Sequence, residues 1–396
     1  MLKKKNEILI CGAGLIGMTF ALLMAKMKIK VCIIDKNNKN QIQNNIDSRT
    51  TAISQGSSKI FENLGLWEDL KKYSQPISQI FVAEGHGHSD IEFNPRNVNE
   101  EALGYIIDNA ILKNTLYKHI KNSKFIHFHD NTEVKEIHNS NPSSSFICTN
   151  RGKFFYKLLV AADGRFSKIR KFSNTKFLFH DYKQKAYVFN ISHTKPHYGI
   201  AVERFFSTGP LALLPMKDRR QGKTSVVWTL DEKKSKDLTS PSKFMKEFKT
   251  HYNNFFGRIL SSSPVKQYNL NVFSCYENFK NNIVLIGDAS QAIHPIAGQG
   301  FNLGLRDSES LSNLISDFKN VGLDLNSLKM KEIYSQKRFI DKNVLVSATH
   351  NLNALFSNKH IIFKILRKAG LRLFSKSNTL KNQSMLYAMG LKHFEL

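Results

Sequence analysis

The chain has 396 residues, 41% of them hydrophobic, which is enough for more than one hydrophobic core. Its 58 lysines and arginines exceed its 32 acids, and the net charge of +26 is typical of proteins that bind nucleic acids or anionic membranes and of lysine-rich chains in general. The basic residues are spread along the whole chain without a nucleic-acid-binding motif, which argues against a nucleic-acid partner. The four cysteines have neither CxxC nor metal-ligand spacing, so we expect no disulfide framework and no metal site.

The N-terminal stretch MLKKKNEILICGAGLIGMTFALLMA has the basic start and apolar run of a signal peptide. However, Glu7 interrupts the basic start, and the glycines of GAGLIG interrupt the apolar run. A second apolar run, VCIID, then ends in an acid. The pattern therefore predicts a βαβ unit with a strand over 7–11, a helix over 15–27 and a strand over 30–34.

Each glycine of this motif has a distinct role if the turn binds a dinucleotide. Gly12 permits the tight turn, Gly14 allows a pyrophosphate to approach the backbone, and Gly17 allows helix and strand to pack closely. Asp35, 18 residues after Gly17, is placed to bind a ribose hydroxyl. The motif does not separate FAD from NAD, and a close helix–strand contact without a ligand is the alternative.

The rest of the chain continues as a mixed α/β pattern. In chain order, we predict a helix over 54–64, a hairpin over 77–93, a helix over 109–120, strands within 124–130, 145–150 and 153–164, a sheet over about 190–230, a helix over 240–260 and a strand over 281–290. The last strand leads into a second glycine-rich stretch, HPIAGQGFNLGLRD, followed by a predicted helix over 301–315. Backbone N–H groups and the helix dipole at such a turn favour the binding of an anion.

Three separated segments, GAGLIG, LVAADGRFSKIR and IVLIGDASQAIHPIAGQGFNLGLRD, resemble the FAD-dependent aromatic hydroxylases, the single-component flavoprotein monooxygenases. HYGIAVERFFSTGPLALLPM, SVVWTL and LKNQSMLYAMGL are similar to the ubiquinone-biosynthesis (Ubi-type) branch. The resemblance covers essentially the whole chain. It implies that the first glycine turn holds the adenosine end of FAD and the second holds the flavin end.

The resemblance implies a set of FAD-binding residues. They are Gly12, Gly14, Gly17, Asp35, Arg49, Asn109, Asp163, Gly164, Asp288, Gly298, Gln299 and Gly300. Asn109 stands where many relatives outside this branch have an arginine, so it can hydrogen-bond a phosphate but adds no charge. Alternatives stay open for two of the others, because Arg49 also fits a solvated loop and Asp288 also fits a helix cap.

The implied chemistry is reduction of FAD by NADH or NADPH, addition of O2 at flavin C4a, and transfer of a hydroxyl group to an electron-rich phenol. Pro295, Gly300 and His294 are candidates beside the reacting flavin, although His294 also fits a role in shaping the turn. Arg204, Leu213, Pro215 and Trp228 are candidates for the substrate pocket, with core packing as the alternative. No residue is identified as the base for the phenol.

The expected architecture is α/β. A Rossmann-like FAD domain is built from 1–75, 100–172 and 272–330, an α+β substrate domain from 76–99 and 173–271, and a helical region from 331–396. Residues 331–396 carry 12 basic and 3 acidic residues, and 361–374 has the pattern of a basic amphipathic helix. We expect a cytoplasmic location. Peripheral contact of this helix with the inner face of the membrane and packing on the FAD domain are both open.

The expected substrate is a polyprenylated phenol of ubiquinone biosynthesis, with O2 as co-substrate and a quinone-synthesis complex as a further candidate partner. A hydroxylase of small soluble phenols or aromatic acids is one alternative. A non-catalytic flavoprotein scaffold is another, because it would also need the FAD-binding motifs.

Overall fold

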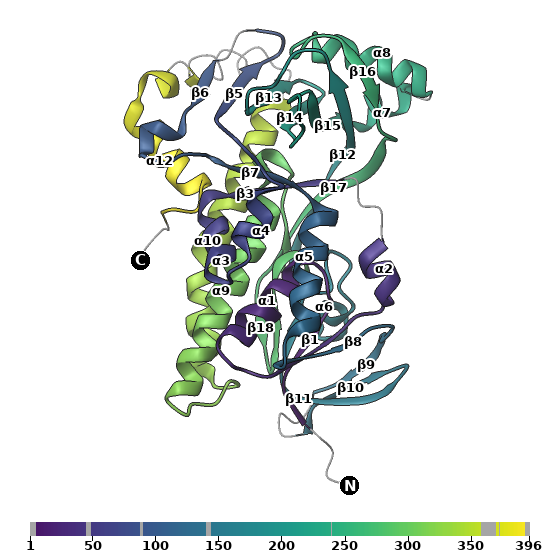
Figure 1. Cartoon of the computed structure of the whole chain (residues 1–396). Helices are drawn as coiled ribbons and strands as arrows, with labels where there is room; N and C mark the ends of the chain where they lie inside the picture. Colours follow the sequence, from purple (N-terminus) through teal and green to yellow (C-terminus); the bar gives the residue numbers. More distant parts are fainter. Residues whose placement is uncertain are drawn as a thin grey trace.

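The computed structural model describes residues 5–44, 49–87, 90–139, 144–238, 240–357, 370–371 and 373–392. Two sheets stand one above the other in Figure 1, and a long helix, α10 (Leu328–Ser357), runs beside both. The α/β fold class predicted from the sequence is confirmed.

The lower sheet has a parallel centre in the order β19, β11, β1, β2 and β8, with β18 antiparallel at one edge and β10 and β9 added beyond β11. Its described strands are β1 (Lys5–Cys11), β2 (Val31–Ile34), β8 (Ile126–His129), β9 (Val134–His138), β10 (Phe146–Thr149), β11 (Gly152–Ala161), β18 (Phe279–Lys280) and β19 (Ile283–Leu285). The predicted βαβ unit is confirmed, with α1 (Leu15–Lys26) between β1 and β2.

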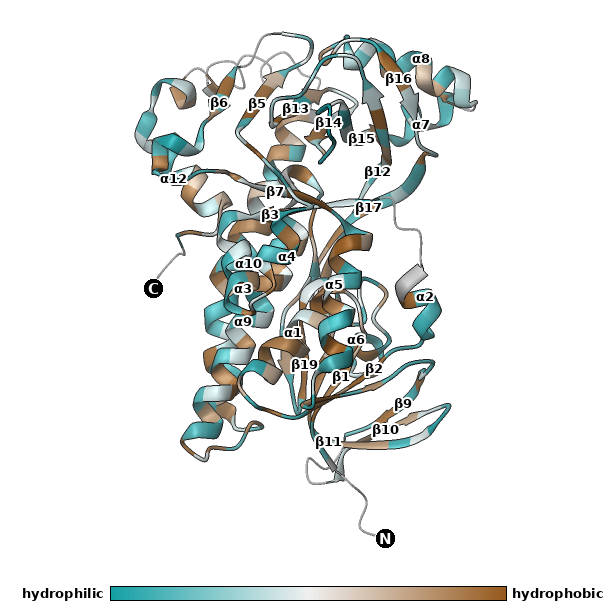
Figure 2. Cartoon of the chain, in the orientation of Figure 1, coloured by the Kyte–Doolittle hydropathy of each residue, from teal (hydrophilic) through white to brown (hydrophobic). Residues whose placement is uncertain are grey.

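Both faces of the parallel centre are buried, which explains why β2, β19 and the last four residues of β1 and of β11 are apolar at every position. On one face, Ile8, Ile10 and Ile33 pack with the helices α1, α5 (Asn109–Asn122) and α9 (Gln299–Asn320). On the other face, Leu9 and Ile34 pack with residues of the β9–β10–β11 layer. Figure 2 shows hydrophobic residues along these central strands and inner helices.

The upper sheet has the order β20, β17, β12, β15, β14, β13, β5 and β6, and β16 also pairs with β12. Its described strands are β5 (Gln79–Glu84), β6 (Ile91–Phe93), β12 (Phe177–His193), β13 (Ile200–Phe206), β14 (Gly209–Pro215), β15 (Lys223–Asp231), β16 (Ile259–Ser262), β17 (Lys266–Cys275) and β20 (Gln291–Ala292). The predicted hairpin over 77–93 forms as β5 and β6. The predicted helix over 240–260 ends earlier, as α8 at Tyr252, and residues 259–260 instead begin strand β16.

The remaining elements connect the two sheets or cover their outer faces. A small antiparallel sheet is formed by β3 (Thr50–Ser54), β7 (Gly104–Asp108) and β4 (Gln75–Pro76). Within the described residues, further helices are α2 (Lys39–Asn44), α3 (Gln55–Asn63), α4 (Trp67–Lys71), α6 (Lys168–Phe172), α7 (Glu232–Asp237), α8 (Pro241–Tyr252) and α12 (Asn378–Ala388), with 3-10 turns η1 (Pro95–Val98), η3 (Gly287–Ala289) and η4 (Ile296–Gly298). The upper sheet extends past residue 271 into β20, and the predicted domain boundaries stay a prediction.

Candidate active site

The first glycine turn leaves the start of α1 open. A Cβ on Gly12, whose φ is +107°, would lie 2.4 Å from the Ala162 carbonyl oxygen, and one on Gly17 would lie 1.9 Å from the Gly12 oxygen. A Cβ on Gly14 would meet nothing within 4 Å. Gly14 caps α1 without a side-chain hydrogen bond, and the first turn has no acid. The first N–H groups of the helix can therefore bind an anion.

Asp35 lies beside this turn at the end of β2. Its Oδ2 accepts a hydrogen bond of 2.6 Å from Ala13 N, and its Oδ1 accepts one of 2.7 Å from Asn37 N. Each carboxylate oxygen can accept more than one hydrogen bond, so ribose hydroxyls still have acceptors here. Asp35 thus also fixes the turn, a role that the sequence did not reveal.

The second glycine turn leaves the start of α9 similarly open. Gly298 is its left-handed N-cap, with φ of +60°, and neither a side-chain cap nor a first-turn acid is present. Asn302 holds the turn against β3, because its amide donates to the carbonyl oxygens of Ala52 (2.9 Å) and Gly298 (3.1 Å) and accepts from Ser54 N (2.8 Å). Asn302 is not among the residues predicted for the site, although it lies in the motif GQGFN.

The two turns meet although 286 positions separate Gly12 from Gly298. A Cβ on Gly304 of α9 would lie 2.8 Å from Ile16 Cδ1, and one on Gly287 would lie 3.1 Å from Ile16 Cγ1. Where α1, α9 and η3 cross, these contacts are close, and the φ of +58° at Gly287 also favours glycine there. The starts of both helices therefore lie near one another.

Asp163 and Gly164 follow β11 and adjoin the first turn, since a Cβ on Gly12 would lie 2.8 Å from Asp163 N. Asp163 Oδ2 accepts from Ile169 N at 3.2 Å, whereas Oδ1 is buried without a partner among the described residues. Desolvation raises the pKa of Asp163, although the Ser167 hydroxyl and nearby backbone N–H groups lower it. A Cβ on Gly164 would meet open space, so this segment can also approach a ligand.

Arg170 joins this loop to the turn that carries Asp288. Its guanidinium donates to the Ala289 oxygen (2.8 Å) and to the Arg165 oxygen (2.7 Å). Asp288 is exposed by surface area, yet desolvation raises its pKa while Arg165 and Arg49 oppose that rise. An accessible carboxylate that interacts with two arginines fits a ligand-binding position.

Arg49 and Asn109 are neighbours at the ends of β3 and β7. Asn109 N donates to the Arg49 oxygen at 3.0 Å, and the Thr51 hydroxyl donates to Asn109 Oδ1. The Arg49 guanidinium lies 5.6 Å from the centre of the Tyr268 ring. Gln299, by contrast, directs its side chain to the Ala388 oxygen (3.1 Å), so only its backbone belongs to the glycine turn.

His294 is buried before this turn, and Pro295 is the N-cap residue of η4. The His294 Nε2 atom lies 3.3 Å from Gln184 Oε1, and the His294 ring packs edge-on against Tyr182. Desolvation, with a smaller contribution from His350, lowers the pKa of His294 to about 4. The imidazole is therefore neutral at neutral pH and a weak base.

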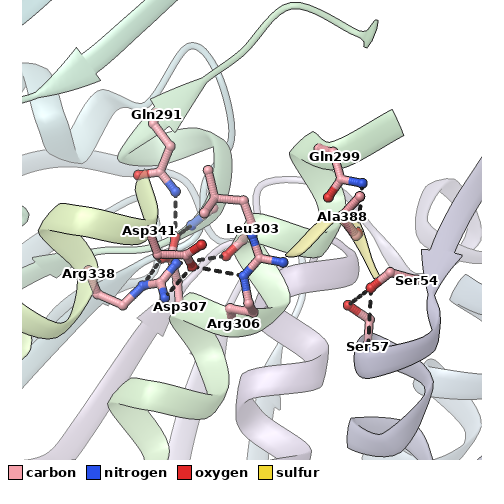
Figure 3. A network of polar contacts seen from close by, with 11 residues as sticks. Ser54, Ser57, Gln291, Gln299, Leu303, Arg306, Asp307, Arg338, Asp341 and Ala388 are labelled. Atoms are coloured by element: carbon pink, nitrogen blue, oxygen red, sulfur yellow. Dashed lines mark hydrogen bonds and ion pairs between the residues drawn. The ribbon is translucent and has the colours of Figure 1, made fainter. Parts of the chain in front are cut away.

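A buried ion network holds the Asp288 turn from behind (Figure 3). Asp307 Oδ2 accepts from Gly287 N (3.0 Å) and Gln291 Nε2 (2.6 Å), and its Oδ1 pairs with Arg338 Nε at 2.6 Å. Arg338 and Arg306 both reach Asp341 at 2.8 Å. The network therefore connects α9 and α10 to the turn.

The four residues predicted for the substrate pocket share one face of the upper sheet. Leu213 and Trp228 face α8 and are packed with Phe244 and Phe248 in a hydrophobic core. Arg204 lies on the same face of the sheet, with its guanidinium 5.2 Å from the centre of the Phe255 ring. Pro215, the last residue of β14, is buried and lies on the same face of the strand as Leu213.

The opposite face of the upper sheet meets the second glycine turn. Phe205 on β13 packs against Ile296 of η4 and stacks on Phe356 of α10, with ring centres 4.0 Å apart. Because strand residues alternate between faces, Glu203 also belongs to this side. Both faces of these strands are largely apolar, so alternation alone cannot show which face borders a substrate, and the predicted pocket residues stay a prediction.

The fold and its paired glycine turns define a dinucleotide-binding α/β protein. The model of the FAD-binding domain family matches residues 5–320, and the chain belongs to this family. Ubiquinone hydroxylase UbiL of Rhodospirillum rubrum is 27% identical over 98% of this chain and 90% of its own length. Ubiquinone hydroxylase UbiM of Neisseria meningitidis is 28% identical over 93% of this chain and 81% of its own.

The 3-demethoxyubiquinol 3-hydroxylase of Escherichia coli is 23% identical over 99% of this chain and 100% of its own. Among solved structures, p-nitrophenol 4-monooxygenase PnpA from Pseudomonas putida has a TM-score of 0.81 and 16% identity, covering 97% of this chain and 98% of its own, which shows a shared fold. The predicted resemblance to FAD-dependent aromatic hydroxylases of the Ubi type is confirmed, as is the enzyme class, an FAD-dependent aromatic-ring monooxygenase.

The described residues fit FAD. Two uncapped helix starts converge, open space lies over Gly14 and Gly164, and a buried carboxylate oxygen of Asp163 lacks a partner among the described residues. These are the donors, the room and the acceptor that a long dinucleotide requires.

Proposed function

We propose that this enzyme hydroxylates the aromatic ring of a polyprenylated phenol in ubiquinone biosynthesis, using NADH or NADPH and O2. The observation that carries the proposal is the largely apolar sheet face that adjoins the second glycine turn. Ala212, Val227 and Val188 follow one another across this face in direct register. An apolar wall beside the flavin end suits a ring that must be oriented away from water. The names of the full-length relatives support the same substrate class.

The chain's own residues would divide the cofactor between the two turns. The start of α1 would bind the pyrophosphate, and Asp35 the adenosine ribose, with Arg49, Asn109, Asp163 and Gly164 nearby. When bound, FAD supplies the redox and oxygen-transfer chemistry. Asp288 would accept hydrogen bonds from the ribityl chain, and N–H groups at Gly298, Gln299 and Gly300 would stabilise negative charge on the reduced flavin.

Pro295 and His294 would shape the space over the flavin. The low pKa of His294, caused by burial, favours this role over that of a base. Holding the ring in this dry space is the protein's main contribution to selectivity.

A polyprenyl tail requires delivery from a membrane. The basic segment 361–374 is proposed to contact anionic lipid, but residues 361–369 and 372 lie outside the described residues. In the part of the chain that the structure describes, no helix is both long and apolar enough to cross a bilayer. Membrane contact and membership of a quinone-synthesis complex are therefore parts of this proposal.

Complementation tests the proposal. The gene would be expressed in bacterial strains that each lack one ubiquinone ring hydroxylase, and quinone intermediates would be measured by mass spectrometry. Rescue of a strain identifies the ring carbon, and Asp288→Asn should reduce rescue whereas Asp69→Asn, on an exposed helix, should not. FAD-loaded protein that rescues no strain would overturn the proposal and favour a soluble-phenol hydroxylase or a scaffold.

A further inference from the structure

Glu203 lies in the middle of β13, on the face of the upper sheet that adjoins the second glycine turn. Its neighbours along the strand on the opposite face, Val202 and Arg204, lie on the α8 side. Two residues further along the strand and on the same face as Glu203, Phe205 packs against Ile296 of the turn. Strand alternation therefore places the Glu203 carboxylate on the flavin side of the sheet.

The surroundings of this carboxylate are apolar. Directly across the ladder stand Val82 on β5 and Ala212 on β14, followed by Val227 on β15. No hydrogen bond or ion pair of the Glu203 side chain is present among the described residues. The side chain nevertheless keeps part of its surface accessible, as expected for a group that borders an internal space rather than filling one.

Burial raises the pKa of Glu203 to about 8, and desolvation is its whole cause. No charged group of the adjoining elements contributes to this shift, including Glu84 on β5, His294 before η4 and Asp341, Lys342 and His350 on α10. An unpaired buried carboxyl group weakens a fold, so its placement here has no structural benefit. Such a group beside a cofactor turn is instead typical of a functional position.

The proposed reaction needs a base that nothing described so far provides. The ring of a phenol is most electron-rich, and so accepts a hydroxyl group most readily, when the phenolic hydroxyl has lost its proton. The ordinary pKa of a phenol is about 10, so at neutral pH a base must remove that proton. A base works best when its own pKa lies near the working pH, which fits Glu203 better than His294.

We propose that Glu203 is the catalytic base that accepts the proton of the substrate's phenolic hydroxyl, an inference that rests on the proposed function. The phenolic O–H bond breaks, a carboxylic O–H bond forms on Glu203, and the electron pair stays on the phenolate oxygen. The proton returns to a phenolate oxygen of the product, or is released to water, so that the carboxylate is restored for the next turnover.

The first test is a binding measurement that requires no turnover. The probe is a ring-fluorinated prenylated phenol acidic enough to be ionised above about pH 6.5, measured by its absorbance with FAD-loaded protein and no reductant. A phenolate binds beside Glu203 only when that group is protonated, so wild-type affinity should fall about thirtyfold between about pH 7 and pH 9.5. Glu203→Gln should bind it with less than about twofold pH dependence.

The second test compares turnover of phenols with different acidity. With an ordinary prenylated phenol, Glu203→Gln should lose about 10²- to 10⁴-fold in kcat/KM, and Glu203→Asp should keep more. With the acidic probe, which needs no base, the loss should shrink to within about threefold. The matched control is Glu92→Gln on edge strand β6, an exposed acid that should behave as wild type in both tests.

These outcomes separate the two proposals. If Glu203→Gln keeps the wild-type pH dependence of binding and loses turnover equally for both phenols, the role of Glu203 is overturned while the proposed function stands. If FAD-loaded wild type hydroxylates no prenylated phenol, the proposed function and the base role both fall. FAD stoichiometry and circular dichroism exclude misfolding, and Glu203→Asp provides a second variant.

Discussion

At the scale of single residues, glycines of one motif serve different physical purposes. Gly12 has a left-handed backbone, and a Cβ there would clash with the Ala162 carbonyl, so the fold itself requires glycine. Gly14 has an ordinary backbone conformation and faces open space, so only a ligand requires its small size. The motif does not reveal this division, because both positions are simply glycine in it.

Substituting alanine at each position should separate folding from binding. Gly12→Ala should destabilise the protein by about 2–4 kcal/mol, because it adds a clash to a strained backbone. Gly14→Ala should cost less than about 1 kcal/mol but weaken FAD binding at least tenfold, since its methyl group occupies the place of the pyrophosphate. Urea denaturation of the apoprotein and FAD fluorescence titration measure the two effects. Equal loss of stability in both variants would contradict this division.

Glu203 should also make stability depend on pH. The pKa of Glu203 in the folded protein is about 8, above the ordinary 4.5. The free energy of unfolding should therefore decrease as the pH rises from about 4.5 to about 8, and the whole loss is present above about pH 8. Glu203→Gln removes the charge, so the variant should match wild type near about pH 5 and exceed it by about 2–4 kcal/mol near about pH 9. Chemical denaturation at both pH values measures this, and Glu92→Gln should show no such difference.

At the scale of elements, α9 and α10 are joined through charges rather than through apolar contacts alone. Asp307 receives the N–H of Gly287 while it pairs with Arg338, so the cofactor turn and α10 share one carboxylate (Figure 3). Arg338 is buried, and the nearby acids raise its pKa despite the opposing effect of desolvation. Charges so enclosed cannot lose one partner without leaving the other uncompensated.

Removing Arg338 should therefore be costly. Arg338→Met is expected to destabilise the protein by about 3–5 kcal/mol and to weaken FAD binding, because Asp307 no longer holds the Gly287 turn. Adding Asp307→Asn to this variant should restore part of the stability, as the buried charge disappears. Asp69→Asn, which breaks the exposed pair with Lys72, should change stability by less than about 1 kcal/mol. A loss no larger than this control would refute the assigned role of the network.

At the scale of the whole molecule, α10 contacts β18 of the lower sheet and β13 and β14 of the upper one, so it fixes the two sheets around the site. The net charge of +26 surrounds this assembly and favours an anionic surface. Residues 331–396 contribute a net charge of +9 to this total.

Membrane contact should be electrostatic and local. The protein should bind phosphatidylcholine vesicles only when they contain phosphatidylglycerol, and binding should fall at least tenfold when salt rises from about 0.1 M to about 0.5 M. Reversing Lys364, Lys368 and Arg372 to glutamate should abolish binding, whereas reversing Lys233, Lys243 and Lys249 should not. Co-sedimentation measures this. Equal effects of the two triple variants would show that diffuse charge, not the C-terminal segment, is responsible.

The sequence by itself determined the βαβ unit, the order of the FAD motifs and the family, because glycines at turns and apolar strand runs are local signals. Only the tertiary structure decided which face of β13 and β14 adjoins the cofactor turn. Both faces of those strands are largely apolar, one packing under α8 and the other against η4 and α10, so Leu213 and Trp228 resemble pocket residues as strongly as their neighbours do. The base candidate Glu203 became visible for the same reason, since a charged residue in a strand acquires meaning only when its surroundings are known.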